Sequence, residues 1–401
     1  MNDLADYVAR INAARVYDVA RVTSLDRARR LSDKLGVEVL LKREDTQDIH
    51  SFKIRGAYNK MSRLPKDVLA KGVLAASAGN HAQGVALSAK KLKTKAVIVM
   101  PETAPKLKID EVRSYGADIV LHGATFSDAA DEAKRIVKEK GLTFIPPYDD
   151  PDVIAGQGTV AKEILEQRPD VDSIFVPIGG GGFAAGVSAY VKGVKPSVKV
   201  YGVEPDDSDC MARSIQEGHP VSLEHPGLFV DGVCVKRPGD ETFRICRECL
   251  DGIIRVKMSE ICSAIQDLFE ATRSVCEPAG ALALAALKKT VKKGDTAVAI
   301  ISGANMNFAS LSFIAGEAIF ARLREEILRN GKVDINEAQQ LLARLKLFLE
   351  PAPDVVALGR AVESALADGV ITEEESNQIA KALDVALDWH MMTISDHDIM
   401  G

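Results

Sequence analysis

The stretch SIFVPIGGGGFAAGVSAYV, residues 173–191, joins an apolar run to an alanine-rich segment through four consecutive glycines. The apolar run predicts a buried β-strand, and the alanine-rich segment predicts a helix. Glycines at the start of a helix leave the N–H groups of its first turn open to an anion, and the helix dipole favours negative charge there. We therefore predict that a phosphate group binds at Gly179, Gly180, Gly181 and Gly182.

Two other interpretations of these glycines stay open at this point. A dinucleotide-binding loop has a similar turn and needs an acidic residue about 20 residues further on. Glu204 ends the next predicted strand at an acceptable distance for that role. The glycines could also form a tight turn that binds no ligand.

The alternation of strand and helix continues along most of the chain. Short β-branched runs lie at 37–42, 95–100, 118–123, 173–178, 199–204 and 297–302. Amphipathic segments between them predict helices, and this alternation is typical of βαβ units that build parallel sheets with helices on both faces. We expect an α/β fold.

The strands fall into two groups, which predict two α/β domains. The small domain would comprise residues 41–144, and the large domain residues 1–40 and 145–315. The Pro/Asp-rich segment IPPYDDPD (145–152) would join them. In such folds ligands bind near the carboxyl ends of the strands, so the motifs should converge in a cleft between the domains.

Residues 316–401 show helical patterning without strand signals and predict an all-helical C-terminal domain. A weak repeat relates 329–345 to 367–383, with a Gly turn (Gly331 or Gly369) followed by an acidic residue (Glu337 or Glu375). The spacing is similar to half of an EF-hand, but Glu326 and Leu328, then Ser364 and Leu366, would have to fill the first ligand positions. We favour helical hairpins over a calcium site and expect no metal.

Bulk properties exclude several classes of protein. A net charge of −6 without a basic block argues against a nucleic-acid partner. The N-terminus lacks an apolar signal region, and no apolar run is long enough to cross a bilayer, so we expect a cytoplasmic protein without membrane contact. Six irregularly spaced cysteines indicate reduced thiols, and the pair Cys246 and Cys249 lacks two further zinc ligands.

Three further segments carry side chains suited to chemistry. Lys53 in SFKIRGAYN (51–59) lies among apolar neighbours, either at an ordinary helix start or as a reactive amine. Ser302 ends the last predicted strand and could bond a heteroaromatic nitrogen. A polar loop at a helix start in 73–92 offers donors for an anion, and Asn80 there could also reach a ring oxygen. The donors of this loop are Ser77, Gly79, Asn80 and His81. A lysine, a phosphate loop, an anion loop and a strand-end serine together suit pyridoxal 5′-phosphate (PLP).

The motifs SFKIRGAYN, SAGNHAQGVA, VIAGQGT, PIGGGGFAAG, EPAGALALA and SGANMNF resemble those of the threonine dehydratases (threonine ammonia-lyases). These enzymes belong to the tryptophan-synthase-β-like, fold type II group of PLP enzymes. The resemblance extends from about residue 15 to about residue 315. It implies the two-domain α/β fold of that group.

The resemblance also implies roles for matching residues. Lys53 would form a Schiff base with PLP and move the α-proton of the substrate. Phe52 would pack beside the cofactor, Asn80 would bond its ring oxygen, and Ser302 would meet its pyridine nitrogen. Gly179 to Gly182 would hold the phosphate, and the loop donors around Asn80 would bind the substrate carboxylate. A serine at the pyridine nitrogen, in place of an aspartate, is expected to limit side reactions such as transamination.

The expected reaction is α,β-elimination of L-threonine to 2-oxobutanoate and ammonia, as in isoleucine biosynthesis, with L-serine as a secondary substrate. We expect a homo-oligomer, a dimer or a tetramer. The biosynthetic enzymes usually end in β-rich ACT-type domains, whereas this tail is helical, so feedback inhibition by isoleucine is not expected.

The alternatives are a serine racemase or serine dehydratase and a non-catalytic regulator with the same fold. Serine racemases carry a serine at the position of Ala78 and a metal-binding carboxylate at the position of Cys210. Both departures favour elimination over racemisation. The intact Lys53, Ser302 and glycine loop argue against a regulator that has lost its chemistry.

Overall fold

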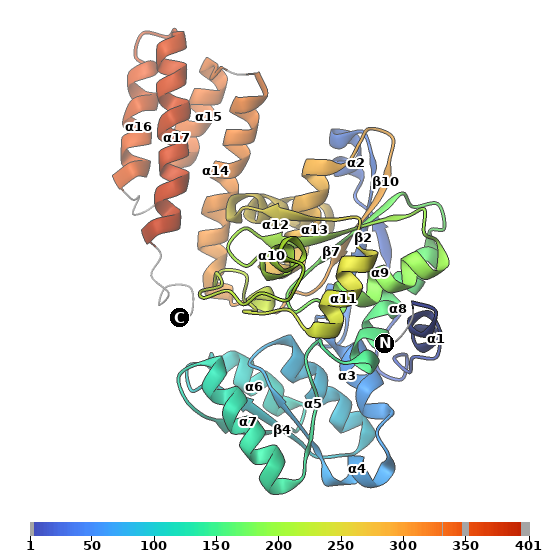
Figure 1. Ribbon diagram of the computed structural model, residues 1–401. Helices are drawn as coiled ribbons and strands as arrows, with labels where there is room; N and C mark the ends of the chain where they lie inside the picture. The colour runs from blue at the N-terminus through green and yellow to red at the C-terminus, as the bar shows by residue number, and fades with distance from the viewer. Residues whose placement is uncertain (1–3, 331, 347–352, 394–401) are drawn as a thin grey trace. The chain divides into compact units, whose positions relative to one another are not determined.

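The structure is a computed structural model that describes residues 4–330, 332–346 and 353–393 (Figure 1). It divides into two compact units. The first comprises the residues up to 256 together with 268–306, and the second comprises 257–267 and the residues from 307 onward.

The first unit contains two sheets. A six-stranded sheet has the order β1-β2-β10-β7-β8-β9, and a four-stranded sheet has the order β5-β4-β3-β6. Neighbouring strands are parallel except for the edge pair β1 and β2. The strands are β1 Leu25–Arg27, β2 Glu38–Arg43, β3 Val73–Ala76, β4 Ala96–Met100, β5 Asp118–Leu121, β6 Thr143–Phe144, β7 Ser173–Pro177, β8 Lys199–Pro205, β9 Gly252–Val256 and β10 Thr296–Ile301. The predicted parallel α/β fold is confirmed.

Helices cover the strands of both sheets (Figure 1). On the six-stranded sheet, α13 packs against β7 to β10, and α9 packs against β7 and β8. On the four-stranded sheet, α5 and α7 both pack against β3 and β4. The helices of this unit are α1 Leu4–Asn12, α2 Arg29–Leu35, α3 Lys53–Ser62, α4 Lys66–Lys71, α5 Asn80–Leu92, α6 Lys106–Ser114, α7 Phe126–Lys140, α8 Pro151–Gln167, α9 Gly182–Val194, α10 Cys210–Glu217, α11 Asp240–Cys249 and α13 Pro278–Thr290, with the end of α12 Met258–Thr272 and the 3-10 turns η1 Glu44–Thr46 and η2 Asp231–Val233.

The strand β2 lies in the six-stranded sheet, paired with β10 in register Val39 to Ala297. The predicted domain boundary at residue 41 therefore falls inside this strand. The pairing joins segments more than half the chain apart and has no local signal in the sequence. The division of the first unit into a small and a large domain stays a prediction.

The helix α3, which begins at Lys53, packs between α5 and α8. The contact with α8 is close enough to require glycine on both helices. A Cβ atom at Gly156 would lie 2.7 Å from the carbonyl oxygen of Arg55, and one at Gly56 would lie 2.3 Å from Nε2 of Gln157. The VIAGQGT motif is thus explained by helix packing.

Four buried charges hold α3 against the six-stranded sheet. The guanidinium of Arg55 donates to Glu44 at 2.7 Å and to Glu163 at 2.6 Å, and Glu163 also accepts from Lys42 at 2.7 Å. All four side chains are at most 1% exposed. Burial alone would lower the pKa of Arg55, but the two carboxylates raise it above its usual value. The network links β2, η1, α3 and α8.

The second unit is helical in its described part, with no strand among those residues. Its helices from residue 307 on are α14 Leu311–Asn330, α15 Ile335–Leu345, α16 Pro353–Ala365 and α17 Glu373–Thr393, preceded by the 3-10 turn η3 Phe308–Ser310. They share a core of their own, which includes Phe320, Leu341, Leu358 and Ile379. The predicted helical appendage is confirmed.

The acidic residues of the EF-hand-like repeat cap helices. Glu337 accepts from the N–H of Asp334 at 2.9 Å, and Glu375 accepts from the N–H of Thr372 at 2.9 Å. In each pair the earlier side chain accepts from the later N–H, which completes a capping box. Gly331 lies outside the described residues. Across the described chain no group of three or more His, Cys, Asp or Glu side chains is arranged to hold a metal ion.

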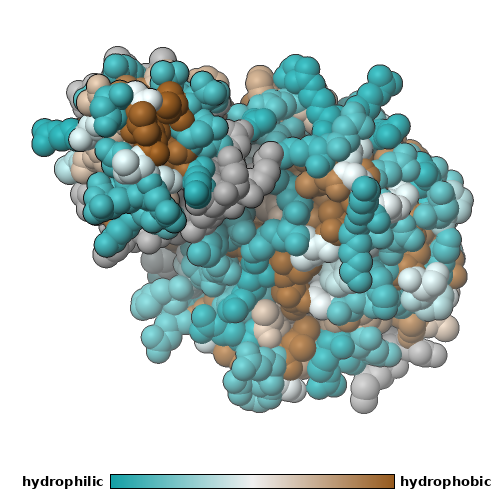
Figure 2. All heavy atoms as spheres, turned by 90° about the horizontal axis from the view of Figure 1, so that it is seen from above, coloured by the Kyte–Doolittle hydropathy of each residue, from teal (hydrophilic) through white to brown (hydrophobic). Residues whose placement is uncertain are grey.

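Hydrophilic side chains cover most of the face drawn in Figure 2, and hydrophobic residues reach it in separate patches. None of the described helices has both the length and the apolar character of a membrane span. The six cysteines are free, and Cys246 and Cys249 are buried on α11, as expected of packed helix cysteines.

The buried network predicts a large loss of stability in Glu163→Gln. Arg55 and Lys42 would lose a shared carboxylate, and breaking a buried ion pair costs about 3–5 kcal/mol. Chemical denaturation should show this loss, whereas Glu139→Gln, which breaks a pair that is more than half exposed on α7, should cost less than about 1 kcal/mol. Equal losses in both variants would contradict the proposed importance of the network.

Candidate active site

Lys53 is the first residue of α3, and its amine is turned toward the segment that joins the sheets. Nζ donates to the carbonyl oxygen of Pro147 at 2.9 Å. Burial lowers the pKa of Lys53 from 10.5 to about 8, although the nearby charge of Glu277 acts in the opposite direction. The neutral, nucleophilic form of the amine is therefore available near neutral pH.

Phe52 connects Lys53 to two other predicted site elements. Its ring stacks on Phe183 in the first turn of α9, with centroids 3.9 Å apart and planes 9° from parallel. Its N–H donates to the carbonyl oxygen of Ser302 at 3.1 Å. Ser302 is buried directly after β10, and its hydroxyl donates to Ala279 at 3.3 Å, a long bond that leaves the hydroxyl able to turn to another partner. The structure thus brings Lys53, Ser302 and the start of α9 together.

The glycine loop follows β7 and opens α9. Gly181 has φ +94°, and a Cβ atom there would lie 2.6 Å from Cε of Met211. Within the described chain, the N–H groups of Gly179, Gly180 and Gly181 bond to no protein acceptor, although Gly180 and Gly181 are buried. Unbonded donors at a helix N-terminus fit an anionic ligand.

The segment between the sheets supports this loop, a role that the sequence did not reveal. A Cβ atom at Gly180 would lie 2.4 Å from the ring of Tyr148. Asp149 accepts the N–H groups of the first turn of α11, including that of Thr242 at 3.2 Å. The hydroxyl of Thr242 then donates to Gly180 at 2.6 Å. The Pro/Asp-rich composition indicated a linker, but the contacts depend on packing across the chain.

The polar loop after β3 forms the N-terminus of α5. The hydroxyl of Ser77 accepts a hydrogen bond from the N–H of Gly79 at 3.2 Å. A Cβ atom added to Gly79 would meet no atom beyond its chain neighbours within 4 Å. Asn80 donates through Nδ2 to Glu277 at 2.8 Å and accepts through Oδ1 from Asn305 at 2.7 Å. The loop therefore combines open space with oriented polar groups.

His81 is buried on α5, and its Nε2 donates to the carbonyl oxygen of Ile145 at 2.8 Å. Burial and the nearby Lys53 lower the pKa of His81 to about 3, so the imidazole is neutral. This bond leaves Nδ1 for the predicted contact with a substrate carboxylate, and that contact stays a prediction.

Glu277 and Asn305 are site residues that the sequence interpretation did not assign. Both lie in motifs quoted above: Glu277 in EPAGALALA directly precedes a proline-led helix, and Asn305 in SGANMNF follows the strand-end Ser302 after Gly303 and Ala304. Their position next to the start of a helix or the end of a strand is the feature of the sequence that could have indicated a role in the site. The structure adds that both hold the amide of Asn80.

Glu204, the acid required by the dinucleotide interpretation, caps α10. Its carboxylate accepts the N–H groups of Met211 at 2.9 Å and Ala212 at 2.8 Å. Burial raises the pKa of Glu204 to about 8. Both oxygens are thus used within the fold, which disfavours a contact with a ribose.

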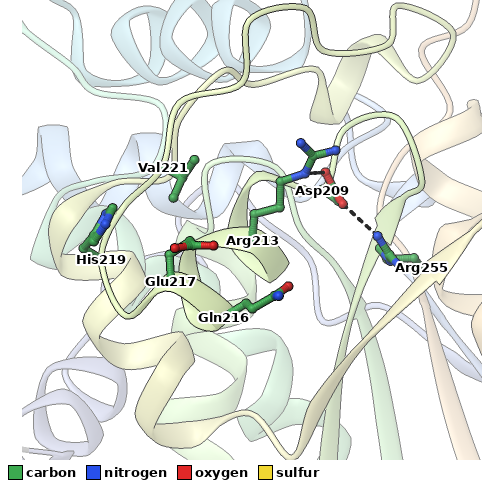
Figure 3. Close-up of a pocket in the computed structure, with 7 residues that line it drawn as sticks. All are labelled: Asp209, Arg213, Gln216, Glu217, His219, Val221 and Arg255. Atoms are coloured by element: carbon green, nitrogen blue, oxygen red, sulfur yellow. Dashed lines mark hydrogen bonds and ion pairs between the residues drawn. The ribbon is translucent and has the colours of Figure 1, made fainter.

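A surface depression of about 510 Å³ lies beside the same helix (Figure 3). Arg213 and Arg255 converge there on the buried Asp209, at 2.7 and 3.0 Å. The depression is lined by Asp209, Arg213, Gln216, Glu217, His219, Val221 and Arg255. None of these residues is predicted to contact cofactor or substrate.

Comparison with known proteins decides the family. The model of the family described as "Pyridoxal-phosphate dependent enzyme" matches residues 16–303. The chain belongs to this family of pyridoxal-phosphate dependent enzymes. The match covers both sheets and every residue predicted to hold the cofactor, so the expected cofactor is confirmed as PLP.

Several relatives within the PLP-dependent family are closely similar. L-threonine dehydratase biosynthetic IlvA of Burkholderia multivorans is 53% identical over 330 residues, which are 80% of this chain and 65% of that protein. Threonine dehydratase 1 biosynthetic, chloroplastic, of Solanum lycopersicum is 52% identical over 80% of this chain and 54% of its own. The chain thus spans less than two thirds of the length of these relatives.

Two solved structures share the fold over more than three quarters of this chain. The processed form of threonine deaminase isoform 2 from Solanum lycopersicum is 46% identical, with a TM-score of 0.77 over 79% of this chain and 88% of that chain. Maize serine racemase is 32% identical, with a TM-score of 0.73 over 78% and 97%. The fold alone therefore does not separate elimination from racemisation.

The residues present fit PLP. The N–H groups of Gly179, Gly180 and Gly181 have no acceptor among the described residues and suit a phosphate, and the amine of Lys53 has a lowered pKa that suits bonding to an aldehyde. Asn80 and Ser302 offer neutral groups suited to a polar aromatic ring. Assignment of each residue to a part of the cofactor remains a proposal.

Gly181→Ala should weaken PLP binding. The new methyl group must displace Met211 or the loop, and either change would disturb the N–H groups predicted to bind the phosphate. We expect at least about tenfold weaker binding in an absorbance titration, or about 1.4 kcal/mol. Gly294→Ala is the matched control, because Gly294 has φ +96° but open surroundings. Equal effects of both variants on PLP affinity would contradict the phosphate site.

The lowered pKa of Lys53 predicts the pH dependence of PLP uptake. Only the neutral amine reacts, so the rate in cofactor-free protein should rise about tenfold per pH unit below pH 8 and level off above it. Stopped-flow absorbance measures this rate, with a free lysine derivative as baseline. A rate that kept rising toward pH 10.5 would indicate an ordinary, solvated lysine.

Proposed function

We propose that the protein is a threonine dehydratase, which converts L-threonine to 2-oxobutanoate and ammonia by α,β-elimination and L-serine to pyruvate more slowly. The observation that carries this proposal is a buried lysine amine with a pKa lowered to about 8, next to Phe52, whose ring stacks on Phe183 directly after a glycine loop whose N–H groups have no acceptor among the described residues. The relatives named threonine dehydratase, about 50% identical over four fifths of the chain, support the substrate.

When bound, PLP supplies an electron-withdrawing ring that stabilises negative charge at the α-carbon of an amino acid. The protein would supply position and proton transfer. Lys53 would hold the cofactor covalently, and its Nζ would accept the α-proton of the substrate. The N–H groups of Gly179 to Gly182 would hold the phosphate, and Phe52, Asn80 and Ser302 would orient the ring. Ser77, Gly79, Asn80 and His81 surround the space for the carboxylate.

Two positions at which this chain differs from the serine racemases favour elimination over racemisation. Racemisation needs a second acid or base on the opposite face of the substrate, and Ala78 offers no ionisable group where racemases carry serine. Cys210 stands where racemases carry a metal-binding carboxylate, and its Sγ lies 4.0 Å from Glu204. Burial raises the pKa of this thiol to about 12, so at neutral pH the position carries no negative charge of the kind that a carboxylate supplies.

We also propose that the enzyme works in the cytoplasm, in isoleucine biosynthesis, as a homo-oligomer of two or four chains. The free cysteines are compatible with a reducing compartment. Residues 1–40 and 145–315 would form the large domain and residues 41–144 the small domain, except that all of β2 (Glu38–Arg43) belongs to the six-stranded sheet.

An assay of 2-oxo acid release tests the activity. The PLP-loaded protein should act on L-threonine, more slowly on L-serine and not on D-serine, without producing D-serine from L-serine. Lys53→Ala should lose the visible absorption band of bound PLP and about 10²–10⁴-fold or more of the rate. Net racemisation of L-serine without 2-oxo acid release would overturn the proposal, and a PLP band without any turnover would point to a regulator.

A further inference from the structure

Asn305 lies in the loop after β10, next to a backbone carbonyl group that decides the orientation of its side-chain amide. Nδ2 donates to the carbonyl oxygen of Ile49 at 2.8 Å. A backbone carbonyl oxygen only accepts hydrogen bonds, so the group beside it must be the NH2 end of the amide. The amide of Asn305 therefore has one permitted orientation, with Nδ2 turned toward Ile49.

The orientation of Asn305 determines that of Asn80. The same Nδ2 donates to Oδ1 of Asn80 at 2.7 Å and to Oε1 of Gln83 at 3.2 Å. An amide NH2 group donates and does not accept, so the atom of Asn80 that faces it must be the carbonyl oxygen. Reversal of the Asn80 amide would bring two NH2 groups together and break the bond. The NH2 group of Asn80 is thus directed away from Asn305.

Glu277 lies at the other end of the Asn80 amide, where it accepts from Nδ2 at 2.8 Å. By itself this carboxyl group does not fix the amide, because a protonated carboxyl group both donates and accepts. Burial raises the pKa of Glu277 to about 8, so the protonated form is present at neutral pH. Asn305, which bonds a group that only accepts, is the member of the network that decides the orientation.

The NH2 group of Asn80 has a second N–H bond to offer. Nδ2 carries two hydrogens. One is donated to Glu277, and among the described residues no acceptor bonds the other. The open space beside the adjacent Gly79 leaves room for a ligand at this end of α5. The second hydrogen is thus available to the ring oxygen of PLP, the partner predicted for Asn80.

We propose that Asn305 is a positioning residue that makes Asn80 a hydrogen-bond donor toward the ring oxygen of bound PLP, so that this oxygen is held in its ionised form. A donated hydrogen bond stabilises the charged form of an acceptor oxygen. With its amide reversed, Asn80 would present a carbonyl oxygen, which disfavours an anion and favours a hydroxyl group. The inference rests on the proposed contact of Asn80 with the ring oxygen and is independent of the substrate.

The visible absorption of the PLP-loaded protein tests this proposal, because bound PLP absorbs at longer wavelength when its ring oxygen is ionised. Asn305→Leu keeps a side chain of similar size but donates no hydrogen bond, so the amide of Asn80 is free to reverse. The ratio of the long-wavelength to the short-wavelength band should fall by about two- to tenfold, the equivalent of one neutral hydrogen bond. No amino acid is added, so the result does not depend on activity toward threonine.

Asn59→Leu is the matched control. Asn59 on α3 is also a buried asparagine whose Nδ2 donates to a backbone carbonyl oxygen, that of Asp152 at 2.6 Å, and whose Oδ1 accepts an N–H, that of Arg15 at 2.9 Å. The same substitution there removes the same kinds of bond outside the network of Asn80. It should leave the band ratio unchanged.

A double-mutant cycle shows whether Asn305 acts through Asn80. In an Asn80→Ala background, Asn305→Leu should cause no further change of the band ratio. An unchanged ratio in Asn305→Leu, an equal change in Asn59→Leu, or the full change in the Asn80→Ala background would overturn the proposal. If Asn80→Ala itself left the ratio unchanged, the proposed contact of Asn80 with the ring oxygen would fail as well.

A second variant covers the case in which Asn305→Leu does not fold. Asn305→Ser keeps one O–H that can donate to the carbonyl oxygen of Ile49, but a single hydrogen cannot also serve Asn80. The band ratio should therefore fall in the same direction as in Asn305→Leu. An unchanged ratio in folded, PLP-loaded Asn305→Ser would equally contradict the proposal.

Discussion

A buried network of four charges determines where α3 begins. Its members are Lys42, Glu44, Arg55 and Glu163. Arg55 lies two residues after Lys53, and its guanidinium bonds carboxylates on both η1 and α8. A shift of α3 along its axis would leave at least one buried charge unpaired, at a cost of several kcal/mol. The amine of Lys53 is thus positioned by an ion network to which the proposed reaction gives no role, and the close contact between α3 and α8 adds to the same constraint.

Around that amine, the fold collects the carboxyl ends of strands from both sheets. The polar loop follows β3, the glycine loop follows β7, and Ser302 follows β10. Parallel strands end at one edge of a sheet, so each strand can contribute a loop to a common site. Most contributions are neutral: backbone N–H groups, an amide and a hydroxyl. In such surroundings burial has the largest effect on the pKa of both Lys53 and Glu277: it lowers that of the amine and raises that of the acid.

Local signals account for what the sequence could predict. The apolar runs, the glycine loop before α9 and the apolar neighbours of Lys53 lie within single segments, and the structure has the corresponding elements. β1 and β6 have three and two residues, too few for a periodic pattern. The bond from Asn80 to Glu277 spans 197 residues, and the contact of Tyr148 with the glycine loop also depends on tertiary packing. The EF-hand-like spacing was ambiguous, because an acidic residue three positions into a helix also completes a capping box.

The central claim is that the amine at the start of α3 and the glycine loop at the start of α9 form one PLP site. Borohydride reduction of the PLP-loaded protein, followed by peptide mapping, tests it most directly because reduction makes the bond between lysine and cofactor permanent. The account predicts a phosphopyridoxyl group on Lys53 in the peptide that contains SFKIRGAYN. A modification on another lysine, or none on Lys53 at full PLP occupancy, would contradict it.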